Sequence, residues 1–93
     1  MAIKSFKSKD AKTLFERGHV RRFANIERIA LRKLVQLNLA QTLDDMRAPP
    51  ANRLEALKGD RAGTWSVRIN QQFRLCFRWQ NGAAEDVEIV DYH

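Results

Sequence analysis

The residues best suited to chemistry stand together at the C-terminus, where a carboxylate, a phenol and an imidazole follow one another as Asp91, Tyr92 and His93. A chain end is usually frayed and inert. These residues continue an alternating strand pattern, however, so a sheet could hold them beside arginines of neighbouring strands. Such groups suit RNA cleavage, because the RNA supplies its own 2′-hydroxyl nucleophile. A base takes the hydroxyl proton, an acid protonates the leaving 5′-oxygen, and cations stabilise the charged phosphorane.

The sequence contains few residues that could support other classes of catalysis. The chain has two histidines and one cysteine, Cys76. This set is too small for a disulfide framework or a cysteine-cluster metal site. The sequence also contains no metal-ligand spacing, phosphate-binding glycine loop or dinucleotide-binding motif. We therefore expect neither a metal nor a cofactor.

Positive charge is concentrated in the first half of the chain. Residues 1–40 hold ten Lys and Arg against three acids (+7), whereas residues 41–93 hold seven against eight (−1), which gives the net charge of +6. This asymmetry favours docking on an anionic surface. The length of 93 residues predicts a single domain over residues 1–93. With no signal peptide or membrane span in the sequence, we expect a cytoplasmic protein without a membrane partner.

Helical signals occupy the first half, after a short strand expected over residues 2–6. Ser8 can cap a helix over residues 9–17 that ends at Gly18. A second helix is expected over about residues 22–40, and a further turn over 42–46. The apolar stripe of the second helix should face the core and consists of Phe23, Ile26, Ala30, Leu34 and Leu37. The far side of this helix carries a basic stripe, which is either solvated or faces phosphates: Arg21, Arg28 and Arg32.

After Pro49 and Pro50 the hydrophobic period changes from helical to alternating. A short strand is expected over residues 53–57. Three further strands, each with one apolar face, are expected in the alternating runs 65–70, 73–79 and 86–90. The predicted class is α+β, with two N-terminal helices packed on one face of a small, mainly antiparallel sheet. The other face of the sheet is open or is covered by a partner.

The hairpin that follows residues 65–70 has a predictable register. A loop over residues 70–72 pairs apolar residues with apolar residues and places Arg68 opposite Arg74. Like charges directly across a hairpin repel each other. Either each arginine therefore finds an acid, such as Glu88 or Glu55, or the two arginines jointly hold a phosphate group.

The sequence resembles the HigB toxins of the RelE/ParE superfamily over essentially its whole length. The most specific segments are LKGDRAGTWS at residues 57–66, FRLCF at 73–77 and VDYH at 90–93. The resemblance implies a compact RelE-like fold and a ribosome-dependent mRNA endoribonuclease. Such an mRNA interferase cleaves mRNA without a metal and thereby inhibits translation. It also implies neutralisation by a HigA-type antitoxin, with operator DNA bound only indirectly through that antitoxin.

The resemblance also implies a set of site residues. The active surface falls on Asp91, Tyr92 and His93, with Arg74 and Lys58 as cations on the phosphate side. Which of these groups is the general base and which the general acid stays open.

Three further features complete the predicted site. Arg68 is added from the hairpin register, and Glu55 stands where related sequences carry a histidine. A carboxylate there could act as a base, pair with Arg74 or weaken cleavage. The basic stripe should point away from the polar face of the sheet and dock on ribosomal RNA; it consists of Arg21, Arg28 and Arg32.

Two other functions compete with the nuclease. A ParE-like toxin would share the fold and poison DNA gyrase by protein contact, but that class lacks the closing cluster of Asp91, Tyr92 and His93. A non-catalytic RNA-binding domain would need exposed aromatic side chains on which bases can stack. The aromatic residues of the strands are instead expected on the inward face: Trp65, Phe73, Phe77 and Trp79.

Overall fold

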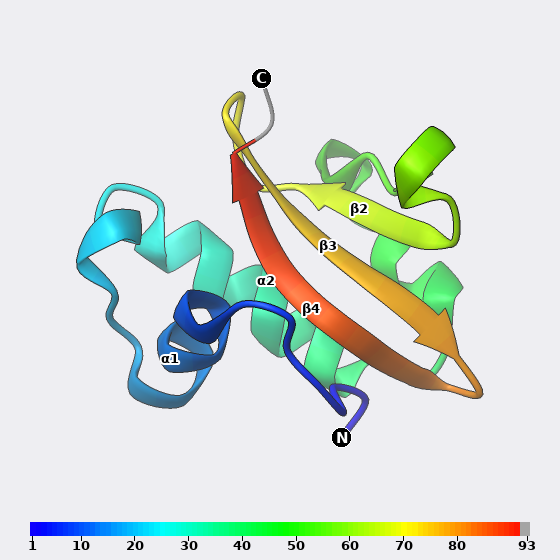
Figure 1. Ribbon diagram of the computed structural model, residues 1–93, viewed down its shortest axis with the longest axis horizontal. Helices are drawn as coiled ribbons and strands as arrows, with labels where there is room; N and C mark the ends of the chain where they lie inside the picture. The colour runs from blue at the N-terminus through cyan, green and yellow to red at the C-terminus, as the bar shows by residue number, and fades with distance from the viewer. Residues whose placement is uncertain (92–93) are drawn as a thin grey trace.

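Two α-helices precede a four-stranded antiparallel sheet in the computed structural model, which describes residues 1–91 (Figure 1). The helices are α1 (Lys9–Arg17) and α2 (Glu27–Leu39). The strands are β1 (Glu55–Ala56), β2 (Thr64–Arg68), β3 (Phe73–Gln80) and β4 (Ala83–Asp91), and they lie in this order across the sheet. Short 3-10 turns complete the chain: η1 (Arg21–Phe23), η2 (Leu43–Arg47), η3 (Pro50–Asn52) and η4 (Gly59–Arg61). The predicted α+β class is confirmed.

The core lies between the helices and one face of the sheet. In Figure 1, α2 lies behind the sheet and α1 lies beside β4. The predicted apolar stripe is buried in the core, with two residues before α2 and three in it: Phe23, Ile26, Ala30, Leu34 and Leu37. Inward-facing strand residues share this core: Val67, Leu75, Phe77 and Val87. The aromatic residues predicted to face inward are buried or packed against this core. Over residues 1–91, no helix has both the length and the apolar character needed to cross a membrane.

The bounds predicted for α1 are confirmed, because both ends carry local stop signals. The hydroxyl of Ser8 accepts a hydrogen bond from the backbone N–H of Ala11 at 3.3 Å. Gly18 ends the helix with φ of 78°, a left-handed conformation that glycine adopts without steric cost, and its N–H donates to the carbonyl of Leu14.

Three predicted elements are shorter in the structure. α2 begins only at Glu27, because the preceding Ile26 has φ of −119° and ψ of 3°, outside the helical region. β1 covers only Glu55–Ala56, because Arg53 turns the chain with a left-handed φ of 47°. Residues 2–6 form isolated parallel bridges to β4 and no continuous strand, because Asp86 in β4 has a φ of 53° and interrupts the ladder.

The register of the β2–β3 hairpin is confirmed, with Arg68 opposite Arg74. The side chain of Asn70 accepts hydrogen bonds from the backbone N–H groups of Gln72 at 2.8 Å and Phe73 at 2.7 Å. These two bonds close the loop and hold it against the start of β3.

A buried polar pair joins α2 to the segment before β1, and the sequence did not predict it. Lys33 is only 9% exposed, and its ammonium donates to the side-chain oxygen of Asn52, which is fully buried. The Asn52 amide in turn donates to the carbonyls of Met46 at 3.0 Å and Ala48 at 3.1 Å. Burial, and then the nearby charge of Arg32, lower the pKa of Lys33. The pair fixes the point at which the chain enters the sheet.

Replacing Asn52 with alanine is expected to lower the free energy of unfolding by about 2–3 kcal/mol, because the buried ammonium of Lys33 and the carbonyl of Met46 lose the partner that Asn52 supplies. Urea denaturation of the purified variant measures this loss. Asn25→Ala, at an exposed position, is the control and should change the stability little. Equal stability of the two variants would contradict a structural role for the pair.

Candidate active site

Arg74 is held rigidly on the polar face of the sheet. Its side chain is 15% exposed, and its Nη1 atom lies 2.8 Å from Oε1 of Glu55 and 2.8 Å from the hydroxyl of Ser66. Glu55 on β1 and Ser66 on β2 are register partners, so three strands converge on this guanidinium. Of the two alternatives for the arginine pair, an acid partner within residues 1–91 is found for Arg74 only. Its neighbour Arg68 instead donates from Nε to the carbonyl of Asn70 at 3.2 Å.

Arg74 and Arg68 line a hollow of about 240 Å³ together with a third arginine, Arg53. Asn70 and Gln71 of the β2–β3 loop complete its wall. The sequence did not predict a functional role for Arg53, because it was expected only as the first residue of a strand over residues 53–57, whereas β1 begins at Glu55. A left-handed backbone with φ of 47° and ψ of 56° marks the position. Three guanidinium groups around one hollow form a site suited to phosphate.

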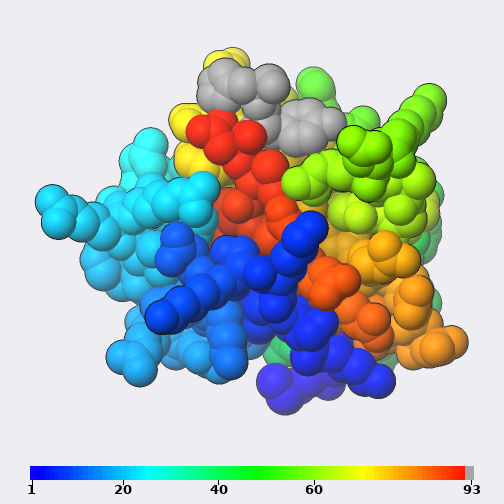
Figure 2. Space-filling model, in the orientation of Figure 1, coloured from blue at the N-terminus to red at the C-terminus, as the bar shows by residue number. Residues whose placement is uncertain are grey.

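β4 ends at the same end of the molecule as the β2–β3 loop (Figures 1 and 2). Asp91 is the register partner of Phe73, and its carboxylate accepts a hydrogen bond from Nε2 of Gln72 at 3.0 Å. Val90, rather than Asp91, lies opposite Arg74. Asp91 is therefore tied to the loop beside the hollow. The predicted site residues Tyr92 and His93 lie outside the described residues.

The remaining predicted cations lie in different places. Lys58 is exposed just before η4 and does not line the hollow of Arg53, Arg68 and Arg74, which we call the arginine hollow. Arg21 and Arg28 are exposed, as the helical spacing predicted. Arg32 is exposed as well, as predicted, but it lines a hollow of about 300 Å³ with Arg68 of the hairpin. The reason is that the β2–β3 loop packs beside α2, which the helical period alone cannot reveal.

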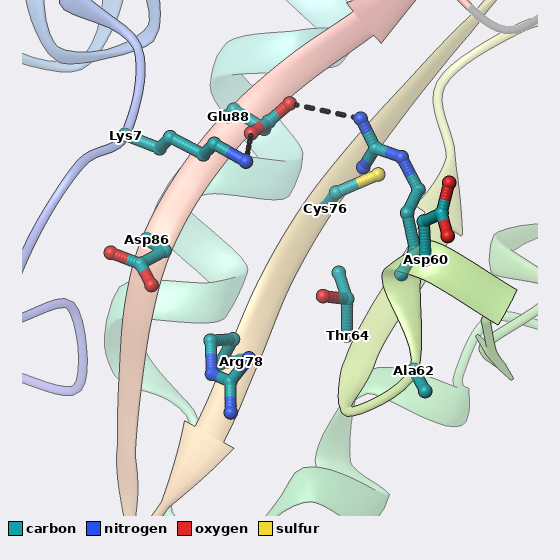
Figure 3. A pocket seen from close by; sticks show the side chains of 9 residues that line it. Lys7, Asp60, Ala62, Thr64, Cys76, Arg78, Asp86 and Glu88 are labelled. Carbon is teal, nitrogen blue, oxygen red and sulfur yellow. Dashed lines mark hydrogen bonds and ion pairs between the residues drawn. The ribbon is translucent and has the colours of Figure 1, made fainter. Parts of the chain in front are cut away.

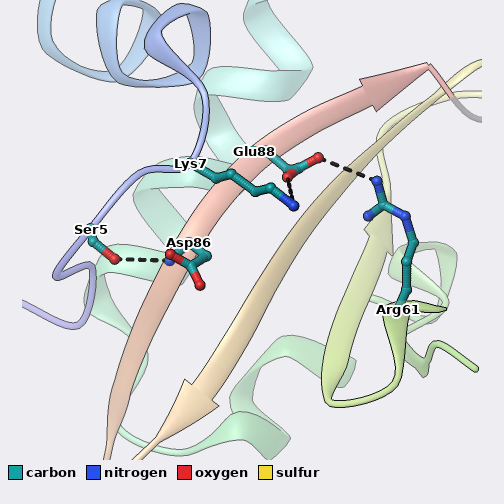
Figure 4. A network of polar contacts seen from close by, with 5 residues as sticks. All are labelled: Ser5, Lys7, Arg61, Asp86 and Glu88. Atoms are coloured by element: carbon teal, nitrogen blue, oxygen red, sulfur yellow. Dashed lines mark hydrogen bonds and ion pairs between the residues drawn. The ribbon is translucent and has the colours of Figure 1, made fainter.

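A third hollow, of about 130 Å³, opens over the middle of the sheet face that carries Arg74 (Figure 3). It contains three cationic and three anionic side chains: Lys7, Arg61, Arg78, Asp60, Asp86 and Glu88. Glu88 bridges the N-terminal segment and η4, with its oxygens 3.5 Å from Nζ of Lys7 and 3.4 Å from Nη2 of Arg61 (Figure 4). The chain's own segments therefore cover this part of the face, and the charges balance there, unlike those of the arginine hollow.

Cys76 lines this third hollow and is fully buried. Burial is the main reason why its pKa is raised to about 11. The thiol therefore stays protonated at neutral pH and is a poor nucleophile. Within residues 1–91, no three His, Cys, Asp or Glu side chains are close enough together to hold a metal ion.

The raised pKa predicts a loss of stability in alkaline solution. The unfolded thiol ionises near its ordinary value of 9.0, whereas the folded thiol holds its proton to about 11. Between these pH values the unfolded state binds fewer protons than the folded state. The free energy of unfolding therefore falls by up to about 2–3 kcal/mol as the pH rises. Urea unfolding of the wild type and Cys76→Ala at about pH 8 and about pH 10.5 isolates this contribution. A difference between the two proteins that does not change with pH would contradict the assignment.

Comparison with known proteins identifies relatives over the whole chain. A family described as the RelE-like toxin of the type II toxin-antitoxin system HigB matches residues 4–93. The chain is 36% identical over 93 residues to the protein named Endoribonuclease HigB of Proteus vulgaris, a match that covers 98% of this chain and 99% of that protein. It is also 46% identical over 61 residues to Toxin HigB-1 of Vibrio cholerae, covering 66% of this chain. The chain spans less than two thirds of the length of this toxin and of a Haemophilus influenzae relative, 64% and 63% respectively.

Solved structures share the fold at low sequence identity. YafQ from Escherichia coli superposes with a TM-score of 0.60 at 18% identity, covering 96% of this chain and 90% of that one. The YoeB–YefM complex from Staphylococcus aureus contains a chain that superposes with a TM-score of 0.60 at 18% identity, covering 100% and 99%. The predicted RelE-like fold is thereby confirmed.

Proposed function

The chain belongs to the HigB-like family of RelE-type toxins, and we propose from that premise that it is an mRNA endoribonuclease that cleaves transcripts on the ribosome and so inhibits translation. One observation carries the proposal. The guanidinium of Arg74, fixed by Glu55 and Ser66, faces a hollow lined by two further arginines beside the end of β4. A phosphodiester seated there would meet cations that need no rearrangement as negative charge develops.

The proposed reaction uses the RNA's own nucleophile. The 2′-oxygen loses its proton to a base and forms a bond to phosphorus, while the bond from phosphorus to the 5′-oxygen breaks and that oxygen takes a proton from an acid. The products are a 2′,3′-cyclic phosphate and a 5′-hydroxyl, so the step consumes no water and needs no metal. Arg74 and Arg68 stabilise the phosphorane. Lys58, exposed before η4 and outside this hollow, is assigned to the phosphate side from the family resemblance alone.

Proton transfer is assigned to the C-terminal cluster of Asp91, Tyr92 and His93, following the family resemblance. Asp91 supports this assignment, because its hydrogen bond to Gln72 ties the strand end to the β2–β3 loop, whose preceding residues Asn70 and Gln71 line the hollow. Glu55 has a different role: its carboxylate is already paired with Arg74 and would lose that ion pair on taking a proton. We therefore assign Glu55 to orienting Arg74.

The proposed partners follow from the family and from the charge. As a type II toxin, the protein would be neutralised by a HigA-type antitoxin in the cytoplasm, and it would reach operator DNA only through that antitoxin. The exposed arginines Arg21 and Arg28 stay assigned to docking on ribosomal RNA, since they lie outside both hollows at the hairpin.

Translation in vitro, followed by primer extension on the mRNA, tests the function. We expect breaks in a translated mRNA and none in the same mRNA without a start codon. Breaks in both would contradict ribosome dependence. Inhibited supercoiling by DNA gyrase without mRNA breaks would identify a ParE-like toxin. RNA binding without either effect would identify a non-catalytic RNA-binding domain, although the buried Phe73 and Phe77 leave little aromatic surface for stacking.

A further inference from the structure

We propose that the hollow between α2 and the β2–β3 loop, lined by Arg32 and Arg68, is a second phosphate-binding site. Together with Arg53 at the edge of the adjoining hollow, it holds the mRNA chain next to the phosphate at Arg74. The proposal rests on the function above and extends it, because it assigns Arg32 and Arg53 to the substrate. It removes Arg32 from the predicted ribosome-docking stripe.

The two hollows at the hairpin form one continuous surface. The hollow of about 240 Å³ contains Arg53, Arg68 and Arg74, and the hollow of about 300 Å³ contains Arg32 and Arg68. Both share Arg68 and the neighbouring Asn70 as wall residues. A polyanion seated at Arg74 therefore reaches Arg32 by passing over Arg68, without leaving the surface. This continuity favours the RNA that is cleaved over a separate molecule as the occupant.

The arginines of the proposed site lack counter-ions within the protein. Over residues 1–91, no carboxylate forms an ion pair with Arg32, Arg53 or Arg68. Elsewhere on the described surface, Arg22, Arg47 and Arg61 pair with Asp10, Asp44 and Glu88 respectively. Within residues 1–91, Arg17, Arg21 and Arg28 also form no ion pair, but they do not line these hollows. Like charges gathered without an acid repel one another, and a bound phosphate removes that repulsion.

The position of Arg53 is imposed by its neighbours. Its backbone is left-handed, at φ of 47° and ψ of 56°, which is unfavourable for a residue with a side chain. The preceding Asn52 is fully buried and hydrogen-bonded to Lys33 and to the carbonyls of Met46 and Ala48, so the bend cannot relax. Strain of this kind is commonly retained where it orients a binding group. Here it brings Arg53 to the edge of the hollow.

Binding to a non-cleavable RNA tests the site without requiring catalysis. The probe is a fluorescein-labelled single-stranded 2′-O-methyl RNA, measured by anisotropy with the full chain. Arg32→Gln and Arg53→Gln should each weaken binding by about tenfold, and the slope of log K against log salt should become less steep by about 0.7 for each. Arg17→Gln removes one exposed charge from α1 and is the matched control. Losses no larger than that of Arg17→Gln would overturn the proposal.

Arg53→Gly separates binding from folding. Glycine adopts the left-handed backbone without the steric cost, so the variant should unfold at a higher temperature and still bind RNA about tenfold more weakly. Higher stability with unchanged RNA affinity would assign Arg53 a purely structural role and would contradict the proposed site.

A second arm distinguishes mRNA from ribosomal RNA as the source of the phosphate. Single neutral methylphosphonate linkages are placed near the cleaved bond of an mRNA on programmed ribosomes, and single-turnover cleavage is measured. One linkage should slow the wild type by about tenfold and should not slow Arg32→Gln any further. Independent, multiplicative losses together with weaker ribosome binding by Arg32→Gln would assign Arg32 to ribosomal RNA and overturn the proposal. If the wild type does not cleave translated mRNA, the proposed function fails, and the 2′-O-methyl RNA still decides whether the phosphate site exists.

Discussion

Alanine in place of Arg74 is expected to slow cleavage of translated mRNA by about a hundredfold to a thousandfold, the loss typical for a preorganised group that stabilises transition-state charge. The guanidinium is fixed by Glu55 and Ser66 before substrate arrives, so it stabilises the phosphorane without rearranging. Single-turnover cleavage on programmed ribosomes measures the loss directly. The variant should stay folded with a loss of about 1–2 kcal/mol, because the buried Ser66 hydroxyl loses its donor whereas Glu55 is half exposed and water can replace its partner.

Arg78→Ala is the matched control for Arg74. Arg78 lies on the same strand and the same face, but it lines the charge-balanced hollow and stands opposite Thr64, away from the hairpin loop. We expect its cleavage rate to fall by no more than about threefold, in line with a minor electrostatic contribution. Equal losses for the two variants would mean that the sheet carries a general basic face and no localised site.

Deleting Tyr92 and His93 is expected to abolish growth arrest and to reduce cleavage by about a hundredfold or more, the contribution typical of general acid–base catalysis. The described fold should survive the deletion. Ile89 is the last buried residue of β4, and the hydrogen bond from Gln72 to Asp91 remains in the shortened chain. Arrest of growth after induction, together with the unfolding temperature of the purified protein, measures both parts of this prediction.

Substitutions refine the interpretation of the deletion. Tyr92→Phe and His93→Gln preserve the length of the chain and remove one titratable group each, so they show which group transfers a proton. A truncated protein that still arrests growth would rule out the C-terminal site. A truncated protein that fails to fold would contradict the expectation that the fold of residues 1–91 survives the deletion.

Local sequence was enough for the elements whose ends and faces are set by neighbouring residues. Ser8 and Gly18 predicted both ends of α1, because capping depends on residues within one helical turn. The alternation of β2 and β3 predicted that Arg68 lies opposite Arg74, because a shift by one residue would turn every apolar side chain to the wrong face. The sequence also offered Glu55 as one of two acids for Arg74, and the structure selects it.

The tertiary structure decided which charges meet. Arg32 and Arg68 are 36 residues apart in the sequence and line one hollow only because the hairpin loop packs beside α2. No periodic pattern in the sequence could place Arg53 at the hollow, because its place there depends on the left-handed backbone of this single residue. The burial of Lys33 could be predicted from spacing, because it falls three residues after Ala30 and four before Leu37 on the buried face of α2. Its partner Asn52 could not be identified from that spacing, because helical periodicity describes one element and contains no information about the segment that packs against it.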